Sequence, residues 1–322
     1  MTTRHSLSSR RVLVTGAAGF LGANLVRGLL EAGCEVHALV HPRTDLVRLN
    51  GVLPSLELHR ADLTDADSLD SALRASRPDL VFHLAATGGH PIDPKGRDAM
   101  VASVVLGTAN LLHCLRPGNV SRLVHLGSGL EYGPCEEPLA ENHLLEPLTF
   151  RGAAKAAATL LCCQEARSTG RSVVVLRPFS VYGPWESPTR FVPSVIRAAL
   201  QNERLPLSAG GIRRDYVFVA DVVEACLLSA GADLSPGEIL NIGSGSPSAD
   251  SEVVAAVEGL FGRRIAVCRG GFPSRDLDSQ VWIADRRRAR ERLGWEPRHA
   301  LSAGLAKTIV WFRKISEEGA SP

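Results

Sequence analysis

The sequence predicts an α/β protein built on a doubly wound parallel sheet, with a smaller and partly interleaved second lobe towards the C-terminus. Three observations support this fold class. Short apolar runs alternate with longer helical patterns, a glycine-rich turn follows the first run, and turns become rich in Gly and Pro after Pro178. Strands that are apolar on both faces are typical of a sheet covered by helices on both sides. The alternation predicts parallel strands joined by crossover helices.

The expected elements follow one another along the chain. Short and nearly continuous apolar runs predict strands over residues 11–15, 35–40, 56–59, 80–84, 122–126 and 173–177. Periodicity of about 3.6 residues predicts the helices between them, over residues 20–31, 66–75, 98–115 and 153–168. Shorter strand-like pieces at 216–219 and 239–242 follow after residue 178, where we expect the first domain to end.

Composition excludes several classes of protein. The 322 residues carry 36 Lys and Arg against 34 Asp and Glu, a net charge of +2, which argues against a nucleic-acid partner. No apolar run reaches the roughly 18 residues that a membrane span needs, and the first ten residues lack the apolar core of a signal peptide. Seven cysteines without a Cys-x-x-Cys pair predict reduced thiols, no metal site and a cytoplasmic location.

The turn after the first predicted strand has the spacing of a dinucleotide-binding loop. Gly16, Gly19 and Gly22 form a Gly-x-x-Gly-x-x-Gly pattern that opens directly into a helix. Glycine permits the tight turn and lets backbone N–H groups at the helix N-terminus approach a diphosphate. A tight turn without a ligand is the alternative. We expect the loop to bind the cofactor through the three glycines and through Ala18, Phe20 and Leu21.

The end of the second strand indicates which dinucleotide is bound. NAD sites usually place a carboxylate there to accept a hydrogen bond from the ribose 2′-hydroxyl. This chain has His41 and Arg43 instead, and both could pair with a 2′-phosphate. We therefore favour NADP(H), with NAD(H) as the alternative. Asp62 and Leu63, after the third strand, are expected at the adenine, although Asp62 could instead cap a loop.

Motifs distributed over nearly the whole chain resemble the extended short-chain dehydrogenase/reductase family, in particular its nucleotide-sugar epimerases, dehydratases and ketoreductases. The matching motifs are Thr15-Gly-x-x-Gly-Phe-Leu-Gly22, His83-Leu-Ala-Ala86, Ser128-x-x-x-Tyr132-Gly133, Leu176-Arg-Pro178, Val181-Tyr-Gly-Pro184, Arg214-Asp-Tyr-Val-Phe-Val219, Asn241-Ile-Gly243 and Leu293-Gly-Trp295.

This resemblance implies a domain organisation and further cofactor contacts. It implies a Rossmann-type NAD(P)-binding domain over residues 1–178, with segments near 214–242 interleaved. Residues 179–322 are then mainly a nucleotide-sugar-binding lobe. It also assigns further cofactor contacts to Leu84, Ala85, Ala86, Lys155 and Pro178.

The resemblance also implies the catalytic residues, and here the chain departs from the family. The family uses a Ser or Thr, a Tyr and a Lys, in which the Tyr exchanges the proton and the Lys lowers the pKa of the Tyr. Ser128 and Lys155 match, but Arg151 occupies the Tyr position. A guanidinium does not act as a base, yet it can stabilise a developing alkoxide. Tyr132 is the nearest alternative proton donor.

Further departures bear on the reaction and the substrate. The family's dehydratases carry an Asp-Glu pair after the Ser or Thr, where this chain has Gly129 and Leu130, so dehydration is disfavoured. Glu131 comes one place later and is expected to face away from the site, because side chains alternate along an extended chain. Arg214 and Arg275 match positions that grip a nucleotide diphosphate, and Thr87 is expected to line the sugar pocket.

We expect from this pattern an NADPH-dependent reductase that acts on a keto group, at C4, of a nucleotide-activated deoxysugar. Reduction needs oxyanion stabilisation and a proton donor, whereas oxidation of a hydroxyl needs a base that Arg151 does not supply. The alternatives are a nucleotide-sugar epimerase with tightly bound NAD and a catalytically silent dinucleotide-binding subunit. The resemblance also favours a homodimer formed through the helices over 98–115 and 153–168.

Overall fold

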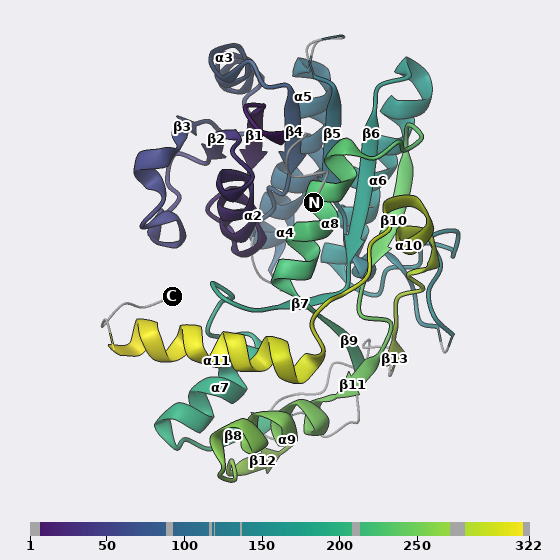
Figure 1. The fold of residues 1–322 in the computed structure, drawn as a ribbon. Helices are drawn as coiled ribbons and strands as arrows, with labels where there is room; N and C mark the ends of the chain where they lie inside the picture. The colour runs from purple at the N-terminus through teal and green to yellow at the C-terminus, as the bar shows by residue number, and fades with distance from the viewer. Residues whose placement is uncertain are drawn as a thin grey trace.

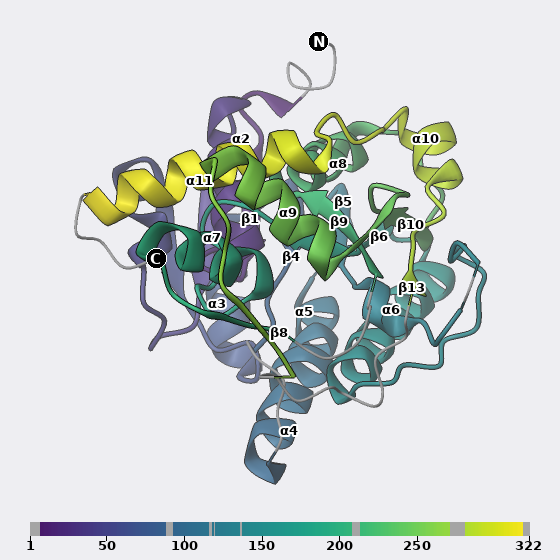
Figure 2. The same cartoon turned by 90° about the horizontal axis from the view of Figure 1, so that it is seen from below.

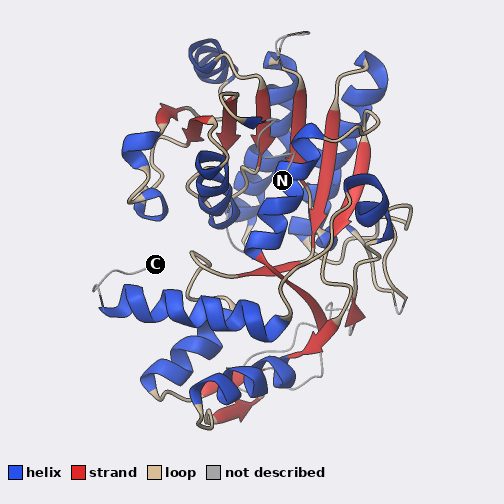
Figure 3. Cartoon of the chain, viewed as in Figure 1, coloured by secondary structure: helices blue, strands red, loops and turns tan. Residues whose placement is uncertain are grey.

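The computed structural model describes residues 7–87, 93–115, 118, 120–135, 137–207, 213–270 and 281–317. Its larger part is a seven-stranded parallel sheet with helices on both faces, as Figures 1 and 3 show. The strand order is β10-β6-β5-β4-β1-β2-β3. The strands are β1 (Arg11–Thr15), β2 (Glu35–Val40), β3 (Glu57–Arg60), β4 (Leu80–His83), β5 (Arg122–Leu126), β6 (Val173–Pro178) and β10 (Glu238–Ile242).

Two separate apolar clusters cover the faces of this sheet. Along β1, Val12 and Val14 belong to one cluster and Leu13 to the other, as the two-residue period of a strand requires. The first face is covered by α2 (Phe20–Glu31), α8 (Val219–Gly231) and α10 (Arg287–Leu293). The second is covered by α3 (Ala66–Ser76), α5 (Gly107–Cys114) and α6 (Phe150–Thr169).

The second lobe has a core of its own and lies below the sheet in Figure 1. In a smaller sheet, β9 pairs with β7, β11 and β13, and a separate pair joins β8 to β12. The strands are β7 (Ser180–Tyr182), β8 (Leu205–Leu207), β9 (Arg213–Phe218), β11 (Pro247–Ala249), β12 (Val267–Arg269) and β13 (Val281–Trp282). The helices are α7 (Phe191–Gln201), α9 (Asp250–Phe261) and α11 (Leu301–Glu317), which lie together in the view of Figure 2.

The remaining helical segments are short. The 3₁₀ turns are η1 (Val47–Leu49), η2 (Leu53–Ser55) and η4 (Gly129–Glu131). The single helix expected over residues 98–115 is instead α4 (Pro94–Met100), a π-helical segment η3 (Val101–Leu106) and α5 in succession. It begins earlier than expected because the carboxylate of Asp93 accepts a hydrogen bond from the Gly96 N–H and caps α4.

The predicted fold class is confirmed by this architecture. Part of the segment near 214–242 lies against the larger sheet, since β10 pairs with β6 and α8 packs against α2. The functional boundary at residue 178 stays a prediction. Among the described residues, the helices include none that combines the length and the apolar character of a membrane span.

The strand order places the reversal point of the sheet between β1 and β4. The chain runs outward from β1 through β2 and β3, and then outward on the other side from β4 through β5 and β6. In open α/β sheets, ligands bind outside the carboxyl ends of the strands at this point. Thr15 and His83, the last residues of β1 and β4, are partners in the strand register here.

Candidate active site

The glycine-rich loop joins β1 to α2 at the carboxyl end of the sheet. Gly16 has a φ of +68°, and a Cβ there would lie 2.7 Å from the backbone nitrogen of Ala85. A Cβ on Gly22 would collide with the carbonyl oxygen of Gly16. Gly19, with extended backbone, is the N-cap of α2. The three glycines therefore expose bare backbone beside the positive end of α2, where a diphosphate can approach closely.

The residues interspersed among these glycines hold the loop in place. Ala18 is 4% exposed in the core under the first face of the sheet. Phe20 packs against the core of the second lobe, and Leu21 packs against both cores. The first turn of α2 therefore lies at the junction of the two lobes.

Polar groups gather where the adenosine end of a dinucleotide would lie. His41 Nε2 is 3.5 Å from Asp62 Oδ2, and the Arg43 backbone N–H donates to His41 Nδ1 at 3.2 Å. Asp62 accepts hydrogen bonds from the backbone and the hydroxyl of Thr64, and the backbone bond is the main cause that lowers the pKa of this carboxyl. Asp62 thus caps its own loop, while the side chain of Arg43 is exposed.

Leu63 and the residues after β4 lie at the carboxyl edge of the sheet. The Leu63 carbonyl accepts a hydrogen bond from Asn110 Nδ2 at 2.8 Å. The backbone nitrogens of Leu84 and Ala85 donate to the carbonyl and the hydroxyl of Thr15, at 3.2 and 3.3 Å. The other cofactor contacts expected here are Ala86, which packs against the cluster of α6, and Pro178, which is buried at the end of β6.

A series of buried side-chain hydrogen bonds joins β1, β4 and α5 beneath this edge. Thr15 Oγ1 lies 2.7 Å from His83 Nδ1, and His83 Nε2 lies 2.9 Å from Thr108 Oγ1. Burial, followed by the charge of Lys155, lowers the pKa of His83 to about 3. The imidazole is therefore neutral at physiological pH, and it fixes the ends of β1 and β4 against α5.

The catalytic candidates Ser128, Arg151 and Lys155 lie at the ends of β5 and α6. The Ser128 side chain accepts a hydrogen bond from the Leu130 N–H at 3.1 Å and caps η4. Lys155 is 5% exposed, and its Nζ donates to the Leu126 carbonyl at 2.6 Å. Arg151 is half-buried in the first turn of α6, four residues before Lys155 and hence on the same helix face.

Tyr132 lies in the core. It is fully buried, its hydroxyl donates to Asn241 Oδ1 at 2.8 Å, and it accepts a hydrogen bond from Arg177 at 2.7 Å. Burial raises the pKa of this phenol to about 12. These contacts leave the hydroxyl no approach to a substrate, so the structure does not support Tyr132 as a proton donor.

Glu131 faces the core, as expected, but it lies in the 3₁₀ turn η4 and not in an extended strand. Its carboxylate pairs with Arg177 at 2.8 Å and accepts hydrogen bonds from the Ser128 N–H at 2.7 Å and the Thr159 hydroxyl at 3.0 Å. Gly129 and Leu130, which occupy the positions of the dehydratase acids, form the rest of η4. Glu131 therefore supports the backbone of Ser128 from behind.

The second lobe supplies one of the two expected diphosphate ligands. Arg214 is half-buried in β9. The neighbouring Asp215 is fully buried and anchors this strand, because its carboxylate accepts from the N–H groups of Gly245 and Ala284. Arg275 lies outside the described residues. Thr87, expected at the sugar, receives a hydrogen bond from Ser103 of η3 at 3.2 Å.

Sequence reasoning missed two charged residues on the loop before α7. Arg190 is the N-cap residue of α7, and its Nε lies 3.8 Å from the buried carboxylate of Glu186. Burial raises the pKa of Glu186 to about 8. Burial first, and then the charge of Arg190, lowers the pKa of Arg151. The four-residue spacing of Glu186 and Arg190 in the sequence was the one feature that could have indicated this ion pair.

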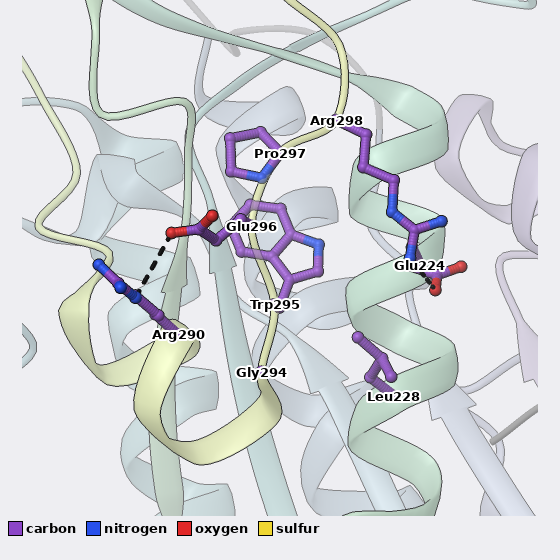
Figure 4. Close-up of a pocket in the computed structure, with 8 residues that line it drawn as sticks. All are labelled: Glu224, Leu228, Arg290, Gly294, Trp295, Glu296, Pro297 and Arg298. Atoms are coloured by element: carbon purple, nitrogen blue, oxygen red, sulfur yellow. Dashed lines mark hydrogen bonds and ion pairs between the residues drawn. The ribbon is translucent and has the colours of Figure 1, made fainter. Parts of the chain in front are cut away.

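A surface cavity of about 530 Å³ lies elsewhere, between α8 and the segment that follows α10. Figure 4 shows its rim, where Arg290 pairs with Glu296 and Arg298 with Glu224. It contains no residue that the sequence assigned to the cofactor or the substrate. Within the described ranges, no three His, Cys, Asp or Glu side chains are grouped as a metal site.

A parallel sheet with a glycine-rich first turn, with Ser128 after β5 and Lys155 on α6, is typical of a Rossmann-type dinucleotide-dependent enzyme. The chain belongs to the NAD dependent epimerase/dehydratase family, whose model matches residues 12–243.

Relatives of known activity match nearly the whole chain. A UDP-glucose 4-epimerase from Mycolicibacterium smegmatis is 34% identical, over 95% of this chain and 100% of the relative. A dTDP-glucose 4,6-dehydratase from Streptomyces antibioticus is 32% identical, over 94% of this chain and 92% of the relative. These two relatives are thus a nucleotide-sugar epimerase and a nucleotide-sugar dehydratase.

Solved structures share the fold and contain the dinucleotide. MoeE5 in complex with UDP-glucose and NAD is 35% identical, with a TM-score of 0.84, over 94% of this chain and 98% of that one. The Thermus thermophilus UDP-glucose 4-epimerase in complex with NAD is 30% identical, with a TM-score of 0.86, over 94% and 99%. These neighbours hold NAD, whereas a preference for NADP(H) finds no support among them.

Proposed function

We propose that this chain is a nucleotide-sugar 4-epimerase that keeps NAD bound between turnovers. The observation that carries the proposal is the placement of Lys155, whose Nζ bonds the Leu126 carbonyl at 2.6 Å, beside Ser128 at the carboxyl end of the sheet. A relative named as a UDP-glucose 4-epimerase and a similar structure in complex with UDP-glucose support a nucleotide sugar as the substrate. The NADPH-dependent reduction of a deoxysugar, which the sequence favours, becomes the second candidate.

The residues of the crevice fit NAD. A Cβ at Gly16 or Gly22 would collide with nearby backbone, so the glycines permit the tight turn at the N-terminus of α2, where a diphosphate would bind. Asp62 is expected to lie at the adenosine end, and Lys155 to bind the nicotinamide ribose. When bound, NAD accepts a hydride from the sugar C4 and later returns it.

The chain's own groups then act on the sugar. Ser128 would donate a hydrogen bond to the C4 oxygen, and Arg151 would stabilise negative charge that develops there. Arg214 would hold the diphosphate, together with Arg275. The residues that hold the diphosphate must let the sugar rotate, because epimerisation requires the hydride to return to the opposite face of the 4-keto intermediate.

Reduction of a nucleotide-4-keto sugar by NADPH is the second candidate, and Arg151 is the observation that favours it. A guanidinium cannot accept the proton that oxidation of a hydroxyl releases, but it can stabilise the oxyanion that forms during reduction. The exposed Arg43 at the end of β2 would suit a 2′-phosphate.

The test uses purified chain without added cofactor. We expect NAD in the acid-released ligand fraction and conversion of UDP-glucose or UDP-glucuronate to the C4 epimer, followed by anion-exchange chromatography. Consumption of NADPH with a nucleotide-4-keto-6-deoxysugar, and no epimerisation, would establish the reductase instead. Bound dinucleotide without turnover in either assay would identify a silent subunit and overturn both candidates.

We also propose that the chain forms a homodimer through η3 and α6. These two adjacent elements expose three apolar side chains, Val101 at 44%, Leu106 at 47% and Leu160 at 54%. Burial of such a patch against a second copy is favourable. Light scattering at assay concentration should return twice the chain mass, and polar replacement of Leu160 should return the mass of one chain. The mass of one chain for the unmodified protein would contradict the proposal.

A further inference from the structure

We propose that the amine of Lys155 takes and returns the proton at the sugar C4 oxygen, and that Arg151 adapts the site to this exchange. The inference rests on the proposed epimerase function. It addresses the chemical difficulty that this function leaves, since the residue at the expected tyrosine position cannot act as a base.

The described contacts leave no tyrosine for the role. The chain has three tyrosines, and each hydroxyl is hydrogen-bonded within the protein: Tyr132 to Asn241 at 2.8 Å, Tyr182 to the Leu301 carbonyl at 3.2 Å and Tyr216 to Asp250 at 3.1 Å. Tyr132 and Tyr182 are at most 1% exposed, and Tyr216 is 7% exposed. Each is an integral part of a core, so none can substitute for the missing phenol.

The position of Lys155 suits proton exchange. Its Nζ is held by the Leu126 carbonyl, two residues before Ser128, so it lies at the strand end that carries the serine. A neutral amine can keep donating one N–H to this carbonyl while its lone pair accepts a proton. The bond to Leu126 therefore fixes Nζ in both protonation states.

The groups around Lys155 together lower the pKa of its amine. Arg151 and Cys162 face it from α6, Glu131 from η4, His83 from β4 and His125 from β5. Burial is the main cause, and the charge of Arg151 the second, that lowers the pKa of Lys155 to about 8. Glu131 acts in the opposite direction, but its carboxylate is bound to Arg177.

In this chain, the residue at the tyrosine position lowers the pKa of the lysine, which is the reverse of the family pattern. In the family pattern, the lysine cation lowers the pKa of a tyrosine one helical turn away. Here the Arg151 cation disfavours a second charge on Lys155, in the same one-turn relation. A lysine that titrates near neutral pH is well matched to general acid–base catalysis.

The proposed step balances in both directions. During oxidation, the C4 hydroxyl proton moves to Lys155, which becomes an ammonium, while the C4 hydrogen leaves with its bonding electrons to the bound NAD. The C4–O bond becomes a carbonyl. During the return step, the hydride re-enters at C4 and the ammonium gives its proton to the oxygen. Arg151 stays charged throughout.

The direct test is the titration of Lys155 by NMR with isotope-labelled lysine. Only four lysines are present, at positions 95, 155, 307 and 314, so the Lys155 signal can be assigned from a Lys155→Met sample. We expect a midpoint near pH 8 in the unmodified protein and an upward shift of about one pH unit in Arg151→Gln. Arg167→Gln, an exposed change on the same helix, is the matched control and should leave the midpoint unchanged.

Activity gives a second and independent readout. In the direction of sugar oxidation, kcat should rise as pH increases through the Lys155 midpoint, and the rise should move upward in Arg151→Gln. Arg151→Tyr should restore a tyrosine-based profile that no longer follows Lys155. A Lys155 midpoint near pH 10 would overturn the proposal even if epimerisation is observed. Absence of epimerisation with a midpoint near 8 would overturn the epimerase function but leave the electrostatic account intact.

Discussion

Exchange of Lys155 for arginine is expected to lower kcat by about 10²- to 10⁴-fold, the range that a general acid–base group contributes. Arginine keeps the positive charge and can donate to the Leu126 carbonyl, but it does not give up its proton at physiological pH. The loss should therefore fall on kcat, while NAD stays bound. Steady-state kinetics and the NAD content of the purified variant measure the two effects separately.

Two further variants make this result interpretable. Lys155→Met should show a similar loss of kcat, and it covers the case in which the larger arginine does not fit the buried site. Lys314→Arg, an exposed change on α11, should retain full activity. If Lys155→Arg folds, holds NAD and turns over within about threefold of the unmodified chain, Lys155 is not the proton acceptor.

The largest expected effect on stability comes from Arg177, which is 1% exposed. Its guanidinium pairs with Glu131 at 2.8 Å, donates to the Tyr132 hydroxyl at 2.7 Å and lies 4.7 Å from the centre of that ring. Arg177→Met leaves the carboxylate of Glu131 buried without its cation. Removal of one partner from a buried pair typically costs about 3–5 kcal/mol. We expect a loss of this size in the free energy of unfolding, measured by urea denaturation.

The double variant Glu131→Gln/Arg177→Met distinguishes the cost of an unpaired charge from the cost of lost side-chain packing. It removes the unpaired charge, so it should recover part of the stability that Arg177→Met loses. Arg167→Met, an exposed change on α6, should change the free energy of unfolding by less than about 0.5 kcal/mol. A loss in Arg177→Met no larger than in this control would show that the buried pair does not hold η4 in place.

Local pattern predicted much of the larger sheet. The strand expected over residues 11–15 and the helix expected over 20–31 coincide with β1 and α2, because an apolar run, a glycine turn and a periodic helix follow one another there. Apart from β9, which the piece expected at 216–219 overlaps, the short strands of the second lobe were missed for the opposite reason. β13 has only two residues, and its pairing with β9 joins positions far apart in the sequence, so no local periodicity marks it.

The candidate site was predictable in position but not in its electrostatics. The resemblance to the family pointed to Ser128, Arg151 and Lys155, and their catalytic roles stay predictions. The interaction of Glu131 with Arg177 spans 46 positions in the sequence. The hydrogen bond between Tyr132 and Asn241 joins residues that are 109 positions apart. Whether a phenol is available or an amine is neutral depends on such contacts, and these become visible only in the folded chain.

The central claim, that hydride leaves and returns at C4 on a dinucleotide the chain retains, is tested most directly with UDP-glucose deuterated at C4. Purified chain without added cofactor would be incubated with this substrate in ordinary water, and the product would be analysed by mass spectrometry. The account predicts the C4 epimer with its deuterium retained at C4. A product that has exchanged the deuterium for solvent hydrogen, or the absence of any epimer, would contradict it.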